Sequence, residues 1–126
     1  AFPSNRDEIP SKYRDLGQPV LVPGSMGTSS WILLGKSNSM DLSFGSTAHG
    51  AGRTMSRSKA RRNYTEDYVK KSLNDKGVFI KALTRDGVVE ETPQAYKDVD
   101  SVVNVSHNLG IATKVAKLVP IGVIKG

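Results

Sequence analysis

The segment GSTAHGAGR, which runs from Gly45 to Arg53, places a histidine among small residues and follows it with arginine. Because Gly50, Ala51 and Gly52 carry almost no side chain, phosphate oxygens could reach backbone N–H groups there. The sequence from Arg53 to Arg62 predicts a helix, whose free N–H groups and dipole would favour an anion at its start. In that setting His49 could attack a phosphorus atom through a neutral ring nitrogen.

Two arginines follow the histidine at helical spacing. Residues four apart lie on one face of a helix, so we expect Arg53 and Arg57 to point the same way. We assign both to a phosphate group of the nucleotide or of an RNA end, where they would balance charge on the oxygens. The other basic residues of this segment are expected to face solvent or to attract RNA weakly; they are Lys59, Arg61 and Arg62.

A second loop of small residues, GSMGTSS, runs from Gly24 to Ser30. It lies between two short apolar segments that predict strands, so we place it at one end of a sheet. Its hydroxyls, Ser25 and Ser30 among them, could form neutral hydrogen bonds with a base or ribose. The other interpretation is a flexible connection whose hydroxyls are solvated.

The pattern of apolar and turn-forming residues predicts a mixed α+β fold with several helices and mixed sheets. Helices are expected where apolar residues recur at helical spacing between capping residues, at 53–62, 66–76 and 99–109, with a short turn after Thr92 and Pro93. Strands are expected at 18–22, 31–35, 78–83, 88–90, 115–118 and 121–124, although 111–117 also fits a helix. Asp86-Gly87 predicts a hairpin turn between two of these strands, and residues 36–48 show no helical period. No repeat or internal boundary is apparent in 1–126.

The amino-acid composition excludes some kinds of catalytic and binding site. The 126 residues include no cysteine, which excludes disulfides and thiol nucleophiles, and a net charge of +6 favours an anionic partner. Gly35-Lys36-Ser37 imitates the end of a P-loop without its first glycine, and the third glycine of a dinucleotide-binding motif is missing after Gly52. No carboxylates accompany His49 or His107 at metal-ligand spacing, and His107 is expected to be a surface or helix-capping residue. Lacking an apolar membrane span or a signal peptide, the chain is expected to be cytoplasmic.

Four blocks occur together and in order: Gly24–Ser30, the His49 segment, ETPQAYKD at Glu91–Asp98, and GVIKG at Gly122–Gly126. With these blocks the chain resembles the C-terminal portion of the RtcB family of RNA-splicing ligases over essentially its whole length. The chain opens with Ala1 rather than methionine, and we expect it to be the C-terminal portion of a single larger catalytic domain.

The resemblance implies a role for particular residues. In this family the histidine of the HGAGR motif attacks the α-phosphate of GTP and holds GMP as a phosphoramidate, which assigns that role to His49. The resemblance also implies that Ser25 and Ser30 contact the guanine nucleotide. It further implies that Tyr96 lies beside the guanine and that Lys125 lies near the guanine O6 atom. The implied GMP site is completed by Gly50, Ala51, Gly52 and Arg53. A buried terminal strand at 121–124 would carry Lys125 inward.

The resemblance further implies a GTP- and manganese-dependent joining of RNA ends, as in tRNA splicing. A 2′,3′-cyclic phosphate or 3′-phosphate end would be activated with GMP and joined to a 5′-hydroxyl end. The manganese ligands of the family belong to motifs upstream, so none is placed in this chain, which we expect to be inactive alone. Implied partners are RNA such as tRNA halves, the upstream part of the ligase, and archease. Ala48 departs from the cysteine common in relatives, with little effect expected.

Two other functions fit the residues. One is a non-catalytic RNA- or nucleotide-binding module in which His49 and the arginines only contact phosphates. The other is a structural domain that packs against a partner chain, with the glycine loops serving turns.

Overall fold

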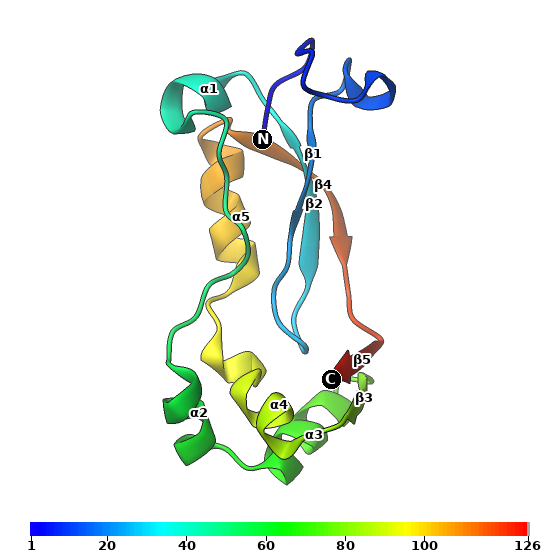
Figure 1. Cartoon of the computed structure of the whole chain (residues 1–126), viewed down its shortest axis with the longest axis vertical. Helices are drawn as coiled ribbons and strands as arrows, with labels where there is room; N and C mark the ends of the chain where they lie inside the picture. Colours follow the sequence, from blue (N-terminus) through cyan, green and yellow to red (C-terminus); the bar gives the residue numbers. More distant parts are fainter. Residues whose placement is uncertain (126) are drawn as a thin grey trace.

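A three-stranded antiparallel sheet forms the upper part of the molecule in the computed structural model, which describes residues 1–125 (Figure 1). Its strands are β1 (Pro19–Val22), β2 (Ser30–Gly35) and β4 (Ala112–Leu118), in the order β1-β2-β4. Alternate residues of each strand point to opposite faces. The inner positions Val22, Leu33 and Ala112 pack with Val99 and Val103 of α5 (Val99–Asn108) in one hydrophobic cluster.

A second, parallel pair of strands lies in the lower part, built from β3 (Phe79–Ala82) and β5 (Gly122–Lys125). Three helices accompany it: α2 (Arg57–Asn63), α3 (Glu66–Asn74) and α4 (Arg85–Glu90). The Thr65 side chain accepts a hydrogen bond from the Tyr68 N–H and so caps α3, as predicted. Leu73 is fully buried in a second cluster, where truncation to alanine would cost about 2–5 kcal/mol.

Shorter elements complete the chain. A 3-10 helix at Ser11–Tyr13 precedes the first strand, α1 (Asn38–Ser43) follows β2, and a second 3-10 helix occupies Pro93–Ala95. None of the described helices is long and apolar enough to cross a membrane. The mixed α+β class predicted from the sequence is confirmed, and residues 112–118 form a strand rather than a helix.

The predicted hairpin around Asp86-Gly87 is wrong, and so is the strand predicted at 88–90. Residues 85–90 form α4, because the Thr84 side chain accepts a hydrogen bond from the Gly87 N–H and caps a helix there. Val88 and Val89 are buried, so the helix gains packing that a hairpin turn at Asp86-Gly87 would lose. The segment 36–48, which shows no helical period, nevertheless contains α1.

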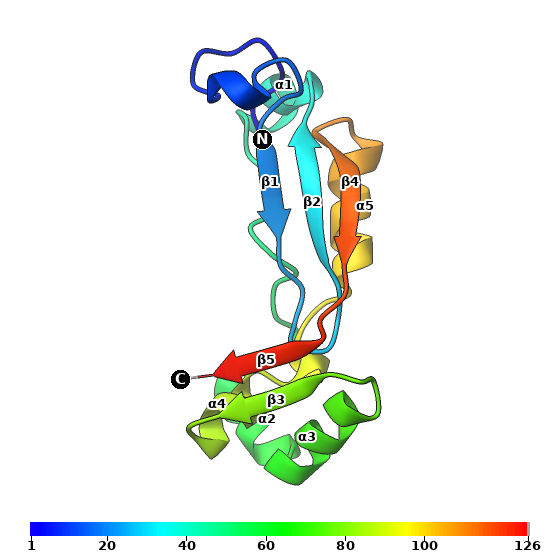
Figure 2. The same ribbon diagram turned by 90° about the vertical axis from the view of Figure 1, so that its right-hand side faces the viewer.

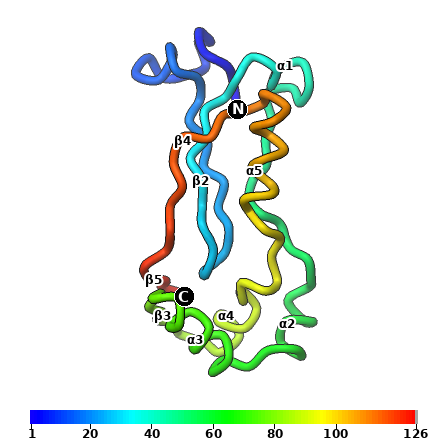
Figure 3. The backbone as a smooth tube through the Cα atoms, turned by 180° about the vertical axis from the view of Figure 1, so that it is seen from behind, coloured from blue at the N-terminus to red at the C-terminus, as the bar shows by residue number. Residues whose placement is uncertain are grey.

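The helix predicted from Arg53 begins only at Arg57, where Ser56 accepts a hydrogen bond from the Lys59 N–H. Arg53 instead forms an isolated antiparallel bridge with Tyr96. The glycines after His49 therefore do not lie at a helix start, which corrects the predicted anion site built on helix N–H groups. The segment runs down one side of the molecule between α1 and α2 (Figure 3).

The loop between β1 and β2 reaches from the upper sheet to the lower part of the molecule (Figure 1). A Cβ atom on Gly27 would lie 2.9 Å from both Leu73 Cδ2 and Pro93 Cγ, so the loop backbone packs directly on α3 and on the 3-10 helix. Met26 is buried in the lower cluster. This loop therefore joins the two parts.

Gly24→Ala tests the tight closure of this loop. A Cβ atom there would lie 2.0 Å from the Ser29 carbonyl oxygen, so the backbone must shift. We expect a loss of about 1–3 kcal/mol in the free energy of unfolding, measured by thermal or denaturant unfolding. Gly122→Ala is the control, because its Cβ would meet only an ordinary contact at 3.7 Å. Equal stability of the two variants would contradict the described loop geometry.

Candidate active site

A single carboxylate, that of Glu91 just after α4, contacts its near neighbour Tyr96 and two residues from distant parts of the chain, Arg53 and Lys125. The Tyr96 hydroxyl donates a hydrogen bond to Glu91 Oε2. Arg53 Nη1 lies 3.5 Å from Oε1, and Lys125 Nζ lies 3.9 Å from Oε2. The Glu91 side chain is only 21% exposed, so these contacts are poorly screened by water. Three of the residues assigned from the sequence thus meet at one point.

Arg53 is fixed by several bonds. Its Nη1 donates to the Tyr96 hydroxyl at 3.0 Å, its Nη2 to the Glu90 carbonyl oxygen at 2.6 Å, and its Nε to the Met55 carbonyl oxygen at 3.0 Å. The backbone bridge holds Arg53 beside Tyr96 through bonds between neighbouring residues, among them Lys97 N–H to Gly52 O at 2.9 Å. The guanidinium is therefore preorganised, with its position set by the backbone on both sides.

Arg57 reaches the same cluster by a different route from the one predicted. Arg53 lies outside the helix, so the two arginines do not share a helix face. Nevertheless, Arg57 Nε lies 3.5 Å from carboxylate oxygens of both Glu90 and Glu91. Its side chain is 63% exposed, which leaves it accessible at the rim of the cluster.

Lys125 points inward because of strand alternation. On β5, Val123 packs against the lower hydrophobic cluster, and Lys125 follows two positions later on the same face. Ile124 between them is 87% exposed. The buried terminal strand predicted at 121–124 is wrong, because Ile121 and Ile124 are 82% and 87% exposed and β5 pairs only with β3 among the described strands. The Lys125 side chain is nevertheless half-buried, at 33% exposure, because it follows Val123 on the covered face.

His49 is exposed on the surface, in an irregular segment. It lines a hollow of about 600 Å³ together with residues of β1, Pro23 and Ser46–Ala48. The Ala51 N–H donates to the Pro23 carbonyl oxygen at 2.9 Å, so the HGAG segment lies against the residue that precedes the serine loop. A Cβ on Gly50 would lie 3.2 Å from that same oxygen, which explains a glycine here.

The serine loop is internally bonded rather than a loose connection. The Ser25 and Thr28 hydroxyls lie 2.8 Å apart, and Ser25 N–H donates to Thr28 Oγ1 at 2.8 Å. Ser30 Oγ accepts from the Gly24 N–H at 3.3 Å. Both assigned hydroxyls, Ser25 and Ser30, are half-buried, and a ligand would have to share or replace these bonds.

The assigned residues thus form two neighbouring groups. Arg53, Arg57, Tyr96 and Lys125 surround Glu91, while His49, Gly50 and Ala51 lie beside Pro23 and the serine loop. The two groups are joined along the chain through Gly52, which has φ +75° and lets the backbone turn between them. Within residues 1–125, no hydrogen bond or ion pair links the His49 side chain to the Glu91 group.

Glu91 was assigned no role from the sequence, although it opens one of the four quoted blocks. Its role depends on Arg53 and Lys125, which only the fold brings close. His107, by contrast, lies exposed as expected, with Nδ1 3.4 Å from Thr113 Oγ1. No group of three or more His, Asp or Glu that could hold a metal ion occurs in the part of the chain that the structure describes.

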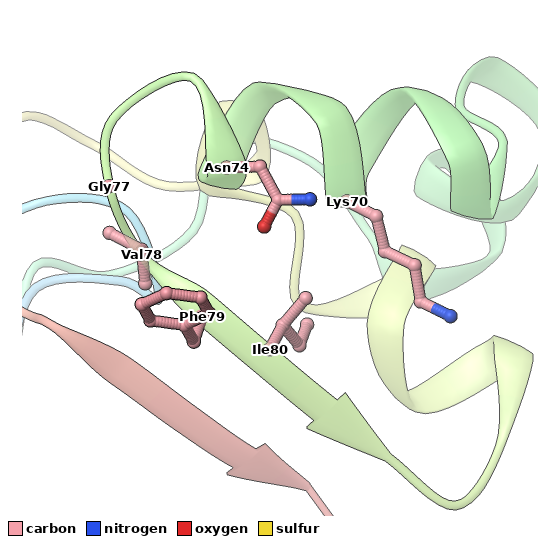
Figure 4. A pocket seen from close by; sticks show the side chains of 6 residues that line it. All are labelled: Lys70, Asn74, Gly77, Val78, Phe79 and Ile80. Atoms are coloured by element: carbon pink, nitrogen blue, oxygen red, sulfur yellow. The ribbon is translucent and has the colours of Figure 1, made fainter.

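A further hollow, of about 430 Å³, lies between α3 and β3 and is lined by Lys70, Asn74 and Gly77–Ile80 (Figure 4). It contains none of the assigned residues and a single charged group, Lys70. Position and lining both separate it from the site around Glu91.

The charges shift two pKa values in the cluster. Partial burial raises the pKa of Glu91, but the hydrogen bond from Tyr96 and the charges of Lys125, Arg53 and Arg57 together bring it below its ordinary value of 4.5. The pKa of Tyr96 is raised above 10.0. Partial burial is the largest cause, and the hydrogen bond to Glu91 and the negative charge of Glu91 add to it, while Arg53 has the opposite effect. Glu91 is therefore ionised and Tyr96 neutral near pH 7.

Glu91→Gln tests the cluster through the pH dependence of stability. Because the pKa of Glu91 is lowered in the folded state, its ionised form stabilises the protein above about pH 4.5, and this contribution is lost as the pH falls through the lowered pKa. We expect the variant to lose about 1–3 kcal/mol at pH 7 and to show a weaker fall in stability towards acid. Asp75→Asn, at an exposed pair with Lys71, should cost under about 0.5 kcal/mol. Parallel pH–stability curves for wild type and Glu91→Gln would contradict the described contacts.

Comparisons with known proteins place the whole chain in one family. A family model described as "tRNA-splicing ligase RtcB" matches residues 1–126. The chain is 51% identical over 126 residues to proteins named tRNA-splicing ligase RtcB from Nanoarchaeum equitans and Pyrobaculum aerophilum, and 50% identical to that from Thermococcus kodakarensis. All of this chain is covered in each case, but only 26% of each relative.

The resemblance inferred from the four sequence blocks is thus confirmed, and those blocks supply the serine loop, the His49 segment, Glu91 with Tyr96, and Lys125. The chain belongs to the tRNA-splicing ligase RtcB family.

Proposed function

We propose that this chain acts as the C-terminal part of a GTP-dependent RNA ligase and that His49 is its nucleotide-carrying residue. The observation that carries this proposal is the convergence of Arg53, Tyr96 and Lys125 on Glu91, beside the glycine segment that holds His49. Polar residues from distant parts of the chain, here Arg53 and Lys125, that meet at one half-buried carboxylate are typical of a ligand site. His49 itself is exposed, as a nucleophile must be.

The proposed chemistry proceeds by two transfers through His49. A neutral imidazole nitrogen attacks the α-phosphorus of GTP, so that a P–N bond forms while the bond to the pyrophosphate leaving group breaks. An oxygen of an RNA 3′-phosphate, which can arise from a 2′,3′-cyclic phosphate, then attacks the same phosphorus and breaks the P–N bond. Finally, an RNA 5′-hydroxyl attacks the activated 3′-phosphate and GMP leaves.

The neighbouring residues would hold the nucleotide. We assign the backbone N–H groups of Gly50 and Gly52 to the phosphate; the Ala51 N–H, which donates to the Pro23 carbonyl oxygen, would have to leave that bond to join them. The hydroxyls of the serine loop, Ser25 and Ser30, are assigned to hydrogen bonds with the guanosine. Tyr96 would flank the base. Its hydroxyl is held by bonds with Arg53 and Glu91, and the Arg53 guanidinium lies 4.9 Å from the centre of its ring.

Lys125 could exchange its contact with Glu91 for a contact with the guanine base. Its Nζ lies 3.9 Å from Glu91 Oε2, which is a long contact, so the ammonium could turn to guanine O6 at little cost. Glu91 would then act as a positioning residue that keeps Lys125 and Arg53 beside the site before the nucleotide binds. Arg57, exposed at the rim, is assigned to phosphate of the nucleotide or RNA end.

The described residues do not fit a manganese site, because no three suitable ligands gather among residues 1–125. We therefore assign the manganese that the family resemblance implies to the part of the relatives that this chain does not cover. RNA is the proposed substrate, in keeping with the net charge of +6. Action on tRNA halves, assistance by archease and a cytoplasmic location remain proposals from the resemblance and the composition.

His49→Ala distinguishes a ligase from a binding module. In the full-length ligase, incubated with GTP labelled at the α-phosphate and with manganese, we expect the substitution to reduce labelling of the protein to background, because it removes the imidazole nitrogen that we assign to the bond with phosphorus. His107→Ala is the matched control and should label like the wild type. Undiminished labelling of His49→Ala would exclude the proposed nucleophile. Loss of RNA affinity without any labelling of the wild type would favour the binding module.

The isolated chain is expected to form no stable GMP adduct. The metal ligands lie elsewhere in this proposal, so neutralisation of the developing phosphate charge would be missing. The measurement is the same labelling assay on residues 1–126 alone, alongside the full-length ligase at equal concentration. A stable adduct on the isolated chain would show that the remainder is dispensable for this step.

A further inference from the structure

The serine loop is tied to α5 by the side chain of Asp100. α5 runs alongside β4 and begins near the lower end of the sheet, where this loop lies (Figure 2). Ser29 Oγ donates a hydrogen bond of 3.1 Å to Asp100 Oδ1, in the first turn of α5. Within residues 1–125, the other hydroxyls of the loop, those of Ser25, Thr28 and Ser30, form their hydrogen bonds inside the loop. Asp100 is therefore the acceptor through which a loop hydroxyl reaches another element.

Two further donors fix the Asp100 carboxylate. Trp31 Nε1 donates to Oδ1 at 2.7 Å, and Lys117 Nζ donates to Oδ2 at 2.5 Å. Trp31 lies on β2 and Lys117 lies opposite it on β4. The bond from Lys117, followed by the bond from Trp31, lowers the pKa of Asp100, so the carboxylate is ionised near pH 7. The acceptor of the Ser29 bond is thus held by two strands of the upper sheet.

The same carboxylate is close in sequence to the other part of the proposed guanosine site. Asp98 caps α5, because its side chain accepts hydrogen bonds from the backbone N–H groups of Asp100 and Ser101. Tyr96 lies just before this cap, and its hydroxyl is bonded to Arg53 and Glu91. Asp100 therefore connects the loop assigned to the guanosine with the segment that carries the tyrosine assigned to the base.

The bond to Ser29 also bears on the hydroxyl of Ser30. A Cβ atom on Gly24 would lie 2.0 Å from the Ser29 carbonyl oxygen, so the two ends of the loop touch at this point. The Gly24 N–H in turn donates to Ser30 Oγ. Holding Ser29 in place therefore restricts the backbone that presents the Ser30 hydroxyl.

We propose that Asp100 is a positioning residue, which acts through Ser29 to hold the serine loop at the spacing from Tyr96 that the guanosine requires. This inference rests on the proposed function, in which the loop and Tyr96 bind the guanosine. A loop that is already ordered loses less conformational entropy when a ligand binds. Loss of the Asp100–Ser29 bond therefore weakens the binding of GTP and leaves the transfer to His49 unchanged.

The test measures the equilibrium binding of GTP to the full-length ligase that carries His49→Ala, in which no GMP can be transferred to that position. We expect Asp100→Ala and Ser29→Ala each to weaken GTP binding by about five- to tenfold, because each removes the same hydrogen bond. Combining the two substitutions should weaken binding no further than about twofold beyond the larger single effect. Asp100→Asn keeps an oxygen that can accept from Ser29 and should stay within about twofold of the parent.

Lys117→Met is the matched control. It removes the ion pair with Asp100 but keeps the Ser29 bond, so GTP affinity should change by no more than about twofold. Melting curves of all variants report their folding. If Asp100→Ala does not fold, Ser29→Ala, which lies outside the helices, carries the test.

A merely structural role for Asp100 would lower the melting temperature without changing the GTP affinity of the folded protein. Unchanged affinity in Ser29→Ala, or effects of Asp100→Ala and Ser29→Ala that multiply in the double variant, would likewise overturn the proposal. The two proposals fail separately. GTP binding that depends on Asp100, in a ligase that forms no adduct on His49, would refute the catalytic proposal alone. An adduct on His49, in a ligase whose GTP affinity is insensitive to Asp100 and Ser29, would refute only the positioning role.

Discussion

The carboxylate of Glu91 is the interaction on which the candidate site depends. It is half-buried, ionised near neutral pH and shared by a tyrosine hydroxyl, two guanidinium groups and an ammonium. Removing a shared charge of this kind leaves its partners repelling one another, with fewer bonds to hold them. Charge balance around this carboxylate therefore holds the cluster together.

The fold brings the contributors of this cluster together through non-local contacts. The bridge between Arg53 and Tyr96 fixes one side, and the alternation of β5 turns Lys125 towards the other. The packing of Gly27 on Leu73 and Pro93 places the serine loop beside the same region. The loop contact links the upper sheet to the lower cluster.

Sequence patterns predicted those helices and strands whose formation depends on neighbouring residues alone. The strands at 18–22 and 31–35 and the helix capped by Thr65 were predicted correctly, because apolar periodicity and a capping hydroxyl act within a few residues. The prediction of a hairpin at Asp86-Gly87 was wrong because helix capping by Thr84 and the burial of Val88 outweighed the turn preference of these two residues. The position of Arg53 and the role of Glu91 depend on partners far along the chain, which no local pattern contains. The family, in contrast, was identified from four blocks taken together; the fold joins residues of three of them, Arg53, Glu91 with Tyr96, and Lys125, in one cluster, whereas His49 lies in a separate hollow beside Pro23.

The central claim is that His49 carries GMP in the complete ligase. The most direct measurement is peptide mapping by mass spectrometry of the full-length protein after brief exposure to GTP and manganese, under alkaline conditions that preserve a phosphoramidate. The account predicts a GMP adduct, labile to acid, on the peptide that contains His49 and on no other. An adduct located on a lysine, or on a histidine elsewhere in the ligase, would contradict it.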